Sequence, residues 1–126
     1  MTTDSSTLLQ GLDVLLLEDE TMISFLIEEM LQDLGAASVR HAARVDAGMK
    51  LLADKAPSLA VLDVNLAGEL IFPLAEQLVT RDIPFVFLTG YGRSGVDDRW
   101  ADYEVIQKPM TTETLEKTLR KVIGAL

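Results

Sequence analysis

The chain has 126 residues, of which 48% are hydrophobic and 25% charged, and it contains no cysteine. These values are typical of one globular domain and exclude disulfides, a thiolate metal site and a thiol nucleophile. Acidic residues outnumber basic ones by 20 to 11, for a net charge of −9, which argues against direct nucleic-acid binding. There is no secretory signal pattern and no apolar run near the roughly 18 residues of a membrane span, so we expect a cytoplasmic protein.

Strand and helix patterns alternate along the chain. Short apolar runs predict five strands, at residues 14–17, 37–42, 59–62, 84–90 and 103–107. Apolar residues at helical spacing predict helices at residues 21–35, 44–57, 73–83 and 111–126. The inward stripe of the first helix is expected to contain Ile23, Leu26, Ile27, Met30, Leu31 and Leu34. The inward stripe of the last helix is expected to contain Leu115, Leu119, Val122, Ile123 and Leu126.

The segment between the fourth and fifth strands, residues 90–102, is the least regular. It carries Gly90, Gly92 and Gly95 in its first half, and each glycine weakens a helix by up to about 1 kcal/mol relative to alanine. We therefore expect a weak or irregular helix at this place.

The alternation of strands and helices predicts parallel βαβ units with right-handed crossovers. Such units form a three-layer α/β fold, here with a five-stranded parallel sheet. Residues 1–11 are expected to be a flexible tail and residues 12–126 a single domain. In folds of this kind the functional site lies beyond the carboxyl ends of the strands.

Polar residues follow four of the five predicted strands. Glu18 and Asp19 come after the first strand, and Asp63 comes after the third. Thr89 ends the fourth strand, and Lys108 follows the fifth. Each residue alone could be a helix cap, a strand end or a solvated lysine. Their convergence at one edge of the sheet favours a common site.

The residue types in this cluster indicate phosphoryl chemistry. Several carboxylates without histidine or thiolate make a hard oxygen site that suits Mg²⁺. A carboxylate beside such an ion can act as a nucleophile toward phosphorus. The oxygens of a transferring phosphoryl group need cations and donors, which Lys108 and Thr89 can supply. Gly90 is expected to leave space beside that group.

Four motifs in chain order now identify a resemblance. LLLEDE, LAVLDVNL, FLTG and QKP, each at a strand end, resemble the CheY-like receiver domain of two-component response regulators over roughly residues 12–126. PLAEQLVTRDIPFVFLTGYG and KPM are further similar to the subgroup named for a FATGUY-like signature, which reads FLTGYG at residues 87–92. The resemblance implies a (βα)5 flavodoxin-like fold.

The resemblance also implies a role for each matching residue. Asp63 would be the phosphoacceptor, Thr89 and Lys108 would contact the phosphoryl oxygens, and the peptide bond between Lys108 and Pro109 would be cis. The implied Mg²⁺ ligands are Glu18, Asp19, Asp63 and the main-chain carbonyl of Asn65. Two positions depart from the common pattern. Glu18 stands where aspartate is common, and Val105 stands where many receivers carry an aromatic switch residue.

The function implied is that of a stand-alone receiver without an output domain. It would accept a phosphoryl group from a sensor histidine kinase or a histidine phosphotransfer protein in a Mg²⁺-dependent reaction. It would then signal to a downstream target protein through a conformational change, as a phosphoacceptor protein rather than an enzyme. Neither nucleic acid nor membrane is expected as a partner.

Three alternative functions are compatible with parts of the sequence. A receiver-like interaction module that is never phosphorylated is the main alternative. A phosphatase of the haloacid dehalogenase type would need an acid two residues after the nucleophile, where this chain has Asn65. The G-x-G-x-x-G pattern at residues 90–95 follows the fourth strand, whereas a dinucleotide site would place it after the first. His41, the only histidine, is expected to face solvent away from the cluster.

Overall fold

The computed structural model describes residues 7–91 and 95–124. Five strands form the central sheet: β1 (Asp13–Leu17), β2 (Ser38–Ala42), β3 (Leu59–Asp63), β6 (Phe85–Thr89) and β7 (Val105–Gln107). Within the described residues the helices are α1 (Thr21–Asp33), α2 (Val45–Asp54), α3 (Phe72–Thr80) and α4 (Thr112–Gly124). The smaller elements are a hairpin of β4 (Asn65–Leu66) and β5 (Glu69–Leu70) and a 3₁₀ helix, η3 (Asp98–Trp100).

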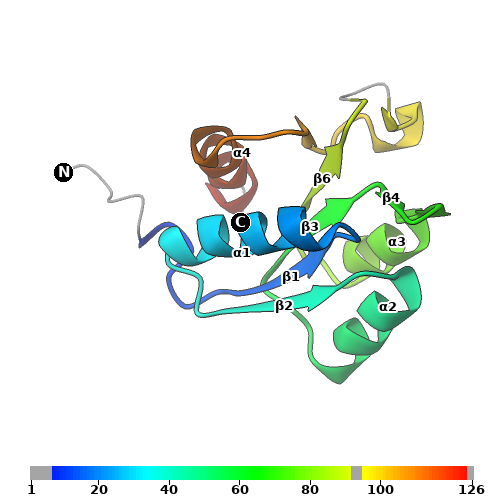
Figure 1. The fold of residues 1–126 in the computed structure, drawn as a ribbon. Helices are drawn as coiled ribbons and strands as arrows, with labels where there is room; N and C mark the ends of the chain where they lie inside the picture. The colour runs from blue at the N-terminus through cyan, green and yellow to red at the C-terminus, as the bar shows by residue number, and fades with distance from the viewer. Residues whose placement is uncertain (1–6, 92–94, 125–126) are drawn as a thin grey trace.

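All neighbouring strands of the central sheet are parallel, in the order β2-β1-β3-β6-β7. Helices α1 and α4 cover one face, and α2 and α3 cover the other, so that helices and sheet form three layers (Figure 1). This arrangement confirms the predicted α/β fold. In the part of the chain that the structure describes, no helix combines the length and the apolar character needed to cross a membrane.

Both faces of the sheet are buried, which explains why its strands are almost wholly apolar. In β3, Leu59 and Val61 pack toward α1 and α4, whereas Ala60 and Leu62 pack toward α2 and α3. All four side chains are fully buried. A polar side chain inside such a strand would lose water without gaining a partner. In the three inner strands, β1, β3 and β6, the polar residues are therefore confined to the strand ends.

The predicted inward stripe of α1 is wrong at one position. Ile27 and Leu31 are buried, but Leu26 is 49% exposed. Met22 and Phe25 are exposed as well, at 78% and 59%. Leu26 lies at the margin of the buried face, because successive residues of an α-helix are rotated by about 100°. The outer side of α1 therefore carries an apolar surface that the rest of the domain leaves uncovered.

The last helix, α4, has the expected amphipathic pattern. Leu115 and Leu119 are fully buried, and Val122 and Ile123 are partly buried against the same core. The remaining member of the predicted stripe, Leu126, lies outside the described residues.

The predicted tail also falls partly outside the described residues. In its described part Leu9 is fully buried, and the Leu9 backbone N–H donates a hydrogen bond to the Leu34 carbonyl at 2.8 Å. Gln10 forms an isolated bridge with Ala36. The packed part of the chain therefore includes residues that precede the predicted start of the domain.

The β4–β5 hairpin is absent from the sequence prediction. Its two-residue turn consists of Ala67 and Gly68, with φ angles of 51° and 94°. Such turns favour glycine, asparagine or aspartate, which tolerate positive φ, so alanine at the first position hides the usual signal. Asn65 Oδ1 closes the turn by accepting a hydrogen bond from the Gly68 N–H at 2.8 Å.

The described part of the connection between β6 and β7 contains only the short η3, in agreement with the predicted weak helix. Asp97 caps η3, because its carboxylate accepts a hydrogen bond from the Arg99 N–H at 3.2 Å. Trp100 is only 4% exposed and stacks on Phe72, with 5.7 Å between the ring centroids. An aromatic side chain therefore anchors this connection to the domain. Residues 92–94 of the predicted segment lie outside the described residues.

A polar network at the amino end of the sheet joins β1, β2 and α2. Arg40 on β2 donates to the Asp13 carboxylate on β1, with Nη2 2.8 Å from Oδ2, and also to the carbonyls of Leu51 and Lys55. Ser38 Oγ donates to Asp13 Oδ1 at 2.7 Å. Burial alone would raise the pKa of Asp13, but the hydrogen bonds from Ser38 and Arg40 and the Arg40 charge outweigh it and lower that pKa.

Asp13→Asn should destabilise the fold in a pH-dependent way. We expect the free energy of unfolding to fall by about 1.5–3 kcal/mol at pH 7, because hydrogen bonds to a charged group are lost. The folded pKa of Asp13 is lowered, so its contribution is complete above the ordinary value of 3.8 and disappears as the pH falls below it. Urea unfolding at several pH values measures this. Asp54→Asn, at an exposed carboxylate of α2, is the control. A deficit that persists unchanged at pH 3 would contradict the argument.

Candidate functional site

The polar residues predicted from the sequence meet at the carboxyl edge of the sheet. Asp63 ends β3, Thr89 ends β6, and both residues are only 4% exposed. Glu18 directly follows β1 and is fully buried, whereas its neighbour Asp19 is partly exposed. Lys108 follows β7. Because β1, β3, β6 and β7 are consecutive in the sheet, their ends bring these side chains together.

The Lys108 ammonium group joins the two buried carboxylates. Its Nζ lies 2.9 Å from Asp63 Oδ2 and 3.0 Å from Glu18 Oε1, and its side chain is 15% exposed. The Lys108 backbone N–H donates to the Thr89 carbonyl at 2.9 Å, which fixes the start of this loop. The peptide bond to Pro109 is cis, as the resemblance implied. The Lys108 charge therefore offsets part of the negative charge of this buried site.

Glu18 and Lys108 have shifted pKa values. Burial raises the pKa of Glu18 from 4.5 to about 7, and the nearby Asp63 charge adds to this, against hydrogen bonds from the Glu20 N–H and Lys108. Burial by itself would lower the pKa of Lys108, but its contacts with Asp63 and Glu18 outweigh that effect and raise it. The lysine stays charged, and the adjacent glutamate holds a proton at neutral pH more readily than an ordinary one.

The acidic side chains lie close enough to share one cation. One carboxylate oxygen from each of Glu18, Asp19 and Asp63 can be chosen so that all three lie within 4.8 Å of one another. A cavity of about 620 Å³ opens over Asp19, Asp63 and Asn65, whereas Glu18 lies beneath it and does not line it. An all-oxygen donor set with open space beside it fits a hard ion such as Mg²⁺, which retains several waters.

Asn65 contributes to the orientation of Asp63. Its backbone N–H donates to Asp63 Oδ1 at 3.3 Å, while Lys108 holds the other carboxylate oxygen. Its side-chain oxygen is engaged by the hairpin turn at Gly68. The side chain of Asn65 therefore stabilises the hairpin turn, and its backbone N–H positions the Asp63 carboxylate.

The glycine that closely approaches Thr89 is Gly95. The Thr89 hydroxyl accepts a hydrogen bond from the Tyr91 N–H at 3.1 Å. A Cβ atom on Gly95 would lie only 2.5 Å from Thr89 Oγ1, whereas a Cβ on Gly90 would meet nothing within 4 Å. The expectation that Gly90 leaves space beside a phosphoryl group stays a prediction, and the close contact at Gly95 is an additional finding. The sequence does not show that the chain returns to Thr89 six residues later.

His41 is exposed, as expected, but it is not remote from the cluster. Its Nε2 lies 2.7 Å from the main-chain oxygen of Glu18 and must carry the proton, because a carbonyl can only accept. The expectation that His41 lies away from the site is therefore wrong. Parallel pairing sets His41 opposite Leu16, two residues before Glu18, and this register could not be read from the weak strand pattern.

Comparison with known proteins agrees with this fold and site. A family model described as the response regulator receiver domain matches residues 14–120. The probable chemotaxis protein CheY of Rhizobium etli is 24% identical, and the similarity covers 93% of this chain and 96% of that protein. The solution structure of SdrG from Sphingomonas melonis Fr1 is 37% identical, with a TM-score of 0.76, over 94% of this chain and 98% of that one.

A second solved structure is also similar. It is the BeF3-activated conformation of SdrG, given as from Pseudomonas melonis Fr1, with 39% identity and a TM-score of 0.74. The similarity covers 85% of this chain and 92% of that one. The family match spans most of the sequence and includes every strand end that carries a polar residue of the site. The chain therefore belongs to the response regulator receiver domain family of two-component systems.

Proposed function

We propose that this receiver is a stand-alone phosphoacceptor that takes a phosphoryl group onto Asp63 from a histidine kinase or a histidine phosphotransfer protein. The contact between Lys108 Nζ and Asp63 Oδ2, at 2.9 Å beside two further acids, is the observation that carries the proposal. The chain aligns over 98% of SdrG and 96% of the CheY relative. A receiver of this kind is a signalling domain and not a conventional enzyme.

The proposed transfer is a displacement at phosphorus. An oxygen of the Asp63 carboxylate forms a bond to phosphorus, and the bond from phosphorus to the imidazole nitrogen of the donor breaks. The electron pair of that bond stays on the imidazole nitrogen, and the leaving imidazole is neutral because its other nitrogen already carries a proton or because it takes a proton from water. Asn65 N–H and Lys108 hold the two carboxylate oxygens, so the nucleophile is oriented before the donor arrives.

The residues around Asp63 would stabilise the charge that the phosphoryl group brings. Mg²⁺, when bound, would supply positive charge to the phosphoryl oxygens. Its proposed ligands are Glu18, Asp19, Asp63 and the main-chain carbonyl of Asn65. Lys108 would contribute its ammonium charge from the opposite side. Thr89 would donate its hydroxyl proton, which it can do while accepting from the Tyr91 N–H, because a hydroxyl both donates and accepts.

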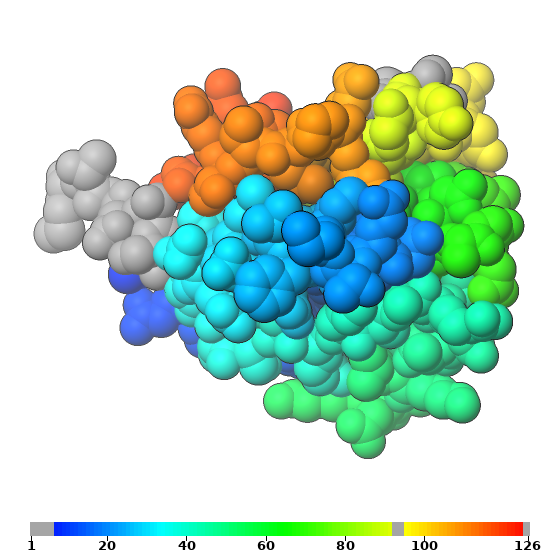
Figure 2. Space-filling view, in the orientation of Figure 1, coloured from blue at the N-terminus to red at the C-terminus, as the bar shows by residue number. Residues whose placement is uncertain are grey.

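The outer side of α1 is the proposed contact surface for the phosphodonor. Met22, Phe25 and Leu26 are exposed there, and a small apolar hollow between α1 and the loop after β7 is lined by Pro109 and Met110. Figure 2 shows this loop, in orange, lying directly against α1, in blue to cyan. Exposed apolar surface of this kind marks interaction sites, and Lys108 lines the same hollow. A protein bound to α1 would therefore be close to Asp63.

We further propose that the signal passes along the segment that follows Thr89. Val105, where an aromatic switch residue is common, is half-buried and pairs with Phe87, and valine lacks the ring that such a switch needs. Gly95 instead touches Thr89 directly, and it begins the described stretch that leads to buried Trp100. A shift of the Thr89 hydroxyl toward a phosphoryl group would therefore move this segment.

The competing functions lack a matching observation. A phosphatase of the haloacid dehalogenase type would need an acid at Asn65, whose amide oxygen closes a turn. The G-x-G-x-x-G pattern leads into η3 and not into a full helix N-terminus. A receiver-like module without phosphorylation would not require Lys108 in contact with two buried acids beside an open cavity.

Asp63→Asn should abolish acid-labile phosphorylation by acetyl phosphate in the presence of Mg²⁺, because the amide is not a nucleophile toward phosphorus. Intact-protein mass spectrometry measures the modification, and circular dichroism checks that the fold is kept. Asp33→Asn, at an exposed carboxylate near the end of α1, should be phosphorylated like the wild type. Undiminished modification of Asp63→Asn would show that another residue is the acceptor.

Asp19→Asn should stabilise the metal-free protein while removing its response to Mg²⁺. The loss of one charge from three crowded carboxylates relieves repulsion, and we expect a gain on the order of 1 kcal/mol. Unfolding measured in EDTA and in Mg²⁺ tests both parts, since an ion that binds only the folded state adds stability that grows with the logarithm of its concentration above the dissociation constant. Asp33→Asn serves again as the control. An unchanged Mg²⁺ dependence in Asp19→Asn would contradict the proposed ligand set.

Gly95→Ala should disturb Thr89, and Gly124→Ala should not. The new methyl group at residue 95 would collide with Thr89 Oγ1, whereas the same group at residue 124, at the end of α4, has open space. Displacement of a positioned donor should slow phosphorylation by roughly tenfold or more. Rates with acetyl phosphate compare the two variants, and NMR signals of residue 89 report whether its side chain has moved. Equal rates for the two variants would show that the close approach of Gly95 does not affect the function of Thr89.

A further inference from the structure

Strand β2 lies at the edge of the sheet beside β1 (Figure 1), and its end holds the main chain of Glu18. The Glu18 backbone N–H donates to the Ala42 carbonyl at 3.2 Å, which extends the pairing of Leu17 with Ala42. His41 Nε2 donates to the Glu18 carbonyl at 2.7 Å. A side chain of β2 therefore continues the hold on the main chain beyond the point where β1 ends.

The carboxylate of Glu18 is held as well. Its Oε1 accepts from Lys108 Nζ at 3.0 Å, and its Oε2 accepts from the Glu20 backbone N–H at 3.1 Å. Glu18 is fully buried, so each of its polar groups needs a partner within the protein. Two of the four partners are main-chain groups, and Lys108 belongs to the site itself. The His41 bond is therefore the contact that a substitution outside the site can remove.

The carbonyl of Glu18 belongs to the peptide unit that joins Glu18 to Asp19. A peptide unit is planar, so the direction of its carbonyl also sets the direction of the Asp19 N–H and the position of the Asp19 Cα atom. Asp19 is partly exposed and lines the cavity over Asp63. A rotation of this peptide unit would therefore move the Asp19 carboxylate relative to Asp63.

The acids of the site repel one another when no cation is bound between them. One oxygen from each of Glu18, Asp19 and Asp63 lies within 4.8 Å of the other two, and like charges at this separation repel. Glu18 and Asp63 are buried and both are bonded to Lys108, so the repulsion acts mainly to push the partly exposed Asp19 outward. A hydrogen bond that holds the peptide unit before Asp19 opposes this movement.

We propose that His41 is a positioning residue of the metal site, whose Nε2–H holds the peptide unit between Glu18 and Asp19 so that the Asp19 carboxylate stays beside Asp63. The inference rests on the proposed function, because it takes Mg²⁺ as the ion that these acids receive. His41 touches neither the ion nor the phosphoryl group in this proposal. It raises the affinity for Mg²⁺ and leaves the transfer step itself unchanged.

The test compares His41→Gln with His41→Met. Glutamine carries an N–H donor at the same number of bonds from the backbone as Nε2, whereas methionine matches its length and has no donor. NMR titration of the ¹⁵N-labelled proteins with Mg²⁺ should show affinity weakened by roughly tenfold in His41→Met, as for other residues that orient metal ligands. His41→Gln should bind Mg²⁺ like the wild type. Wild-type affinity in His41→Met, or equal weakening in both variants, would overturn the proposal.

A measurement on the metal-free protein tests the hydrogen bond itself. In EDTA at alkaline pH, where an ordinary imidazole is neutral, NMR of the ¹⁵N-labelled ring should find the proton of His41 on Nε2. A proton on Nδ1 would contradict the proposal, because Nε2 could then not donate to the Glu18 carbonyl.

Phosphorylation by acetyl phosphate separates an effect on the metal from an effect on transfer. His41→Met should react slowly at low Mg²⁺ and reach the wild-type rate at saturating Mg²⁺. A rate that stays low at saturation would contradict the proposal, because His41 would then act on the transfer step. Failure of the wild type to bind Mg²⁺ would overturn the proposed function together with this inference. Normal Mg²⁺ binding by the wild type and by both variants would overturn this inference alone.

Discussion

The bridge from Lys108 to Glu18 and Asp63 is the interaction on which the site depends. Both carboxylates lie at the ends of strands that are buried on two faces, where an unpaired charge would be strongly destabilising. Lys108 follows the end of β7, two strands away from β3, so the Lys108 and Asp63 side chains together bridge a separation of about 10 Å. The contacts of Lys108 thereby link the end of β7 to the ends of β1 and β3. A parallel sheet with this strand order brings the three residues together although they lie far apart in the sequence.

Much of this arrangement could be predicted, because its causes are local. Apolar runs mark the strands, since both faces of the sheet are covered, and a polar residue directly after such a run must lie at the sheet edge. The elements that were missed depend on information that the local pattern lacks. The β4–β5 hairpin uses Ala67 at a positive φ, where sequence reasoning expects glycine or asparagine. The contact of His41 with Glu18 depends on the register of an edge strand. The close approach of Gly95 to Thr89 depends on how a glycine-rich connection folds back.

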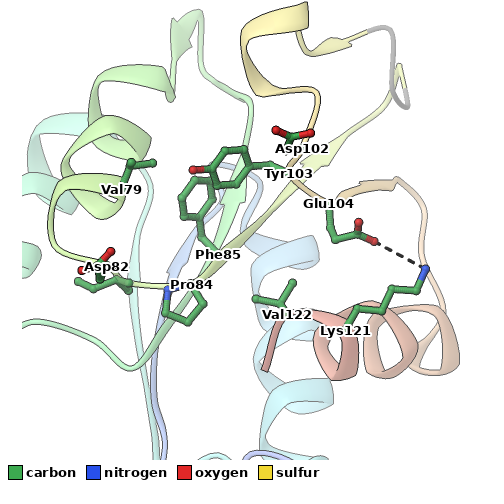
Figure 3. Close-up of a pocket in the computed structure, with 10 residues that line it drawn as sticks. Val79, Asp82, Pro84, Phe85, Asp102, Tyr103, Glu104, Lys121 and Val122 are labelled. Carbon is green, nitrogen blue, oxygen red and sulfur yellow. Dashed lines mark ion pairs between the residues drawn. The ribbon is translucent and has the colours of Figure 1, made fainter. Parts of the chain in front are cut away.

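Two cavities lie at opposite ends of the sheet. The carboxyl edge gathers charged groups around a cavity, and its residues match the receiver family from β1 to the loop after β7. At the amino end of β6, a cavity of about 400 Å³ is lined by Phe85, Tyr103 and several acids (Figure 3). Strand β6 connects the two cavities, because it begins at Phe85 and ends at Thr89 in the site. The short η3 follows Thr89 in the chain and precedes Tyr103, whose ring stacks on Phe85 at the start of β6.

A crystal structure with Mg²⁺ and beryllofluoride tests the central claim most directly. Beryllofluoride stands in for a phosphoryl group on a carboxylate, and a related protein, SdrG, has been solved in a BeF3-activated conformation. The account predicts beryllofluoride bonded to Asp63, with the Lys108 ammonium and the Thr89 hydroxyl in contact with its fluorine atoms and a metal ion held by the neighbouring acids. Beryllofluoride bound to a different residue, or an adduct on Asp63 that Lys108 does not contact, would contradict it.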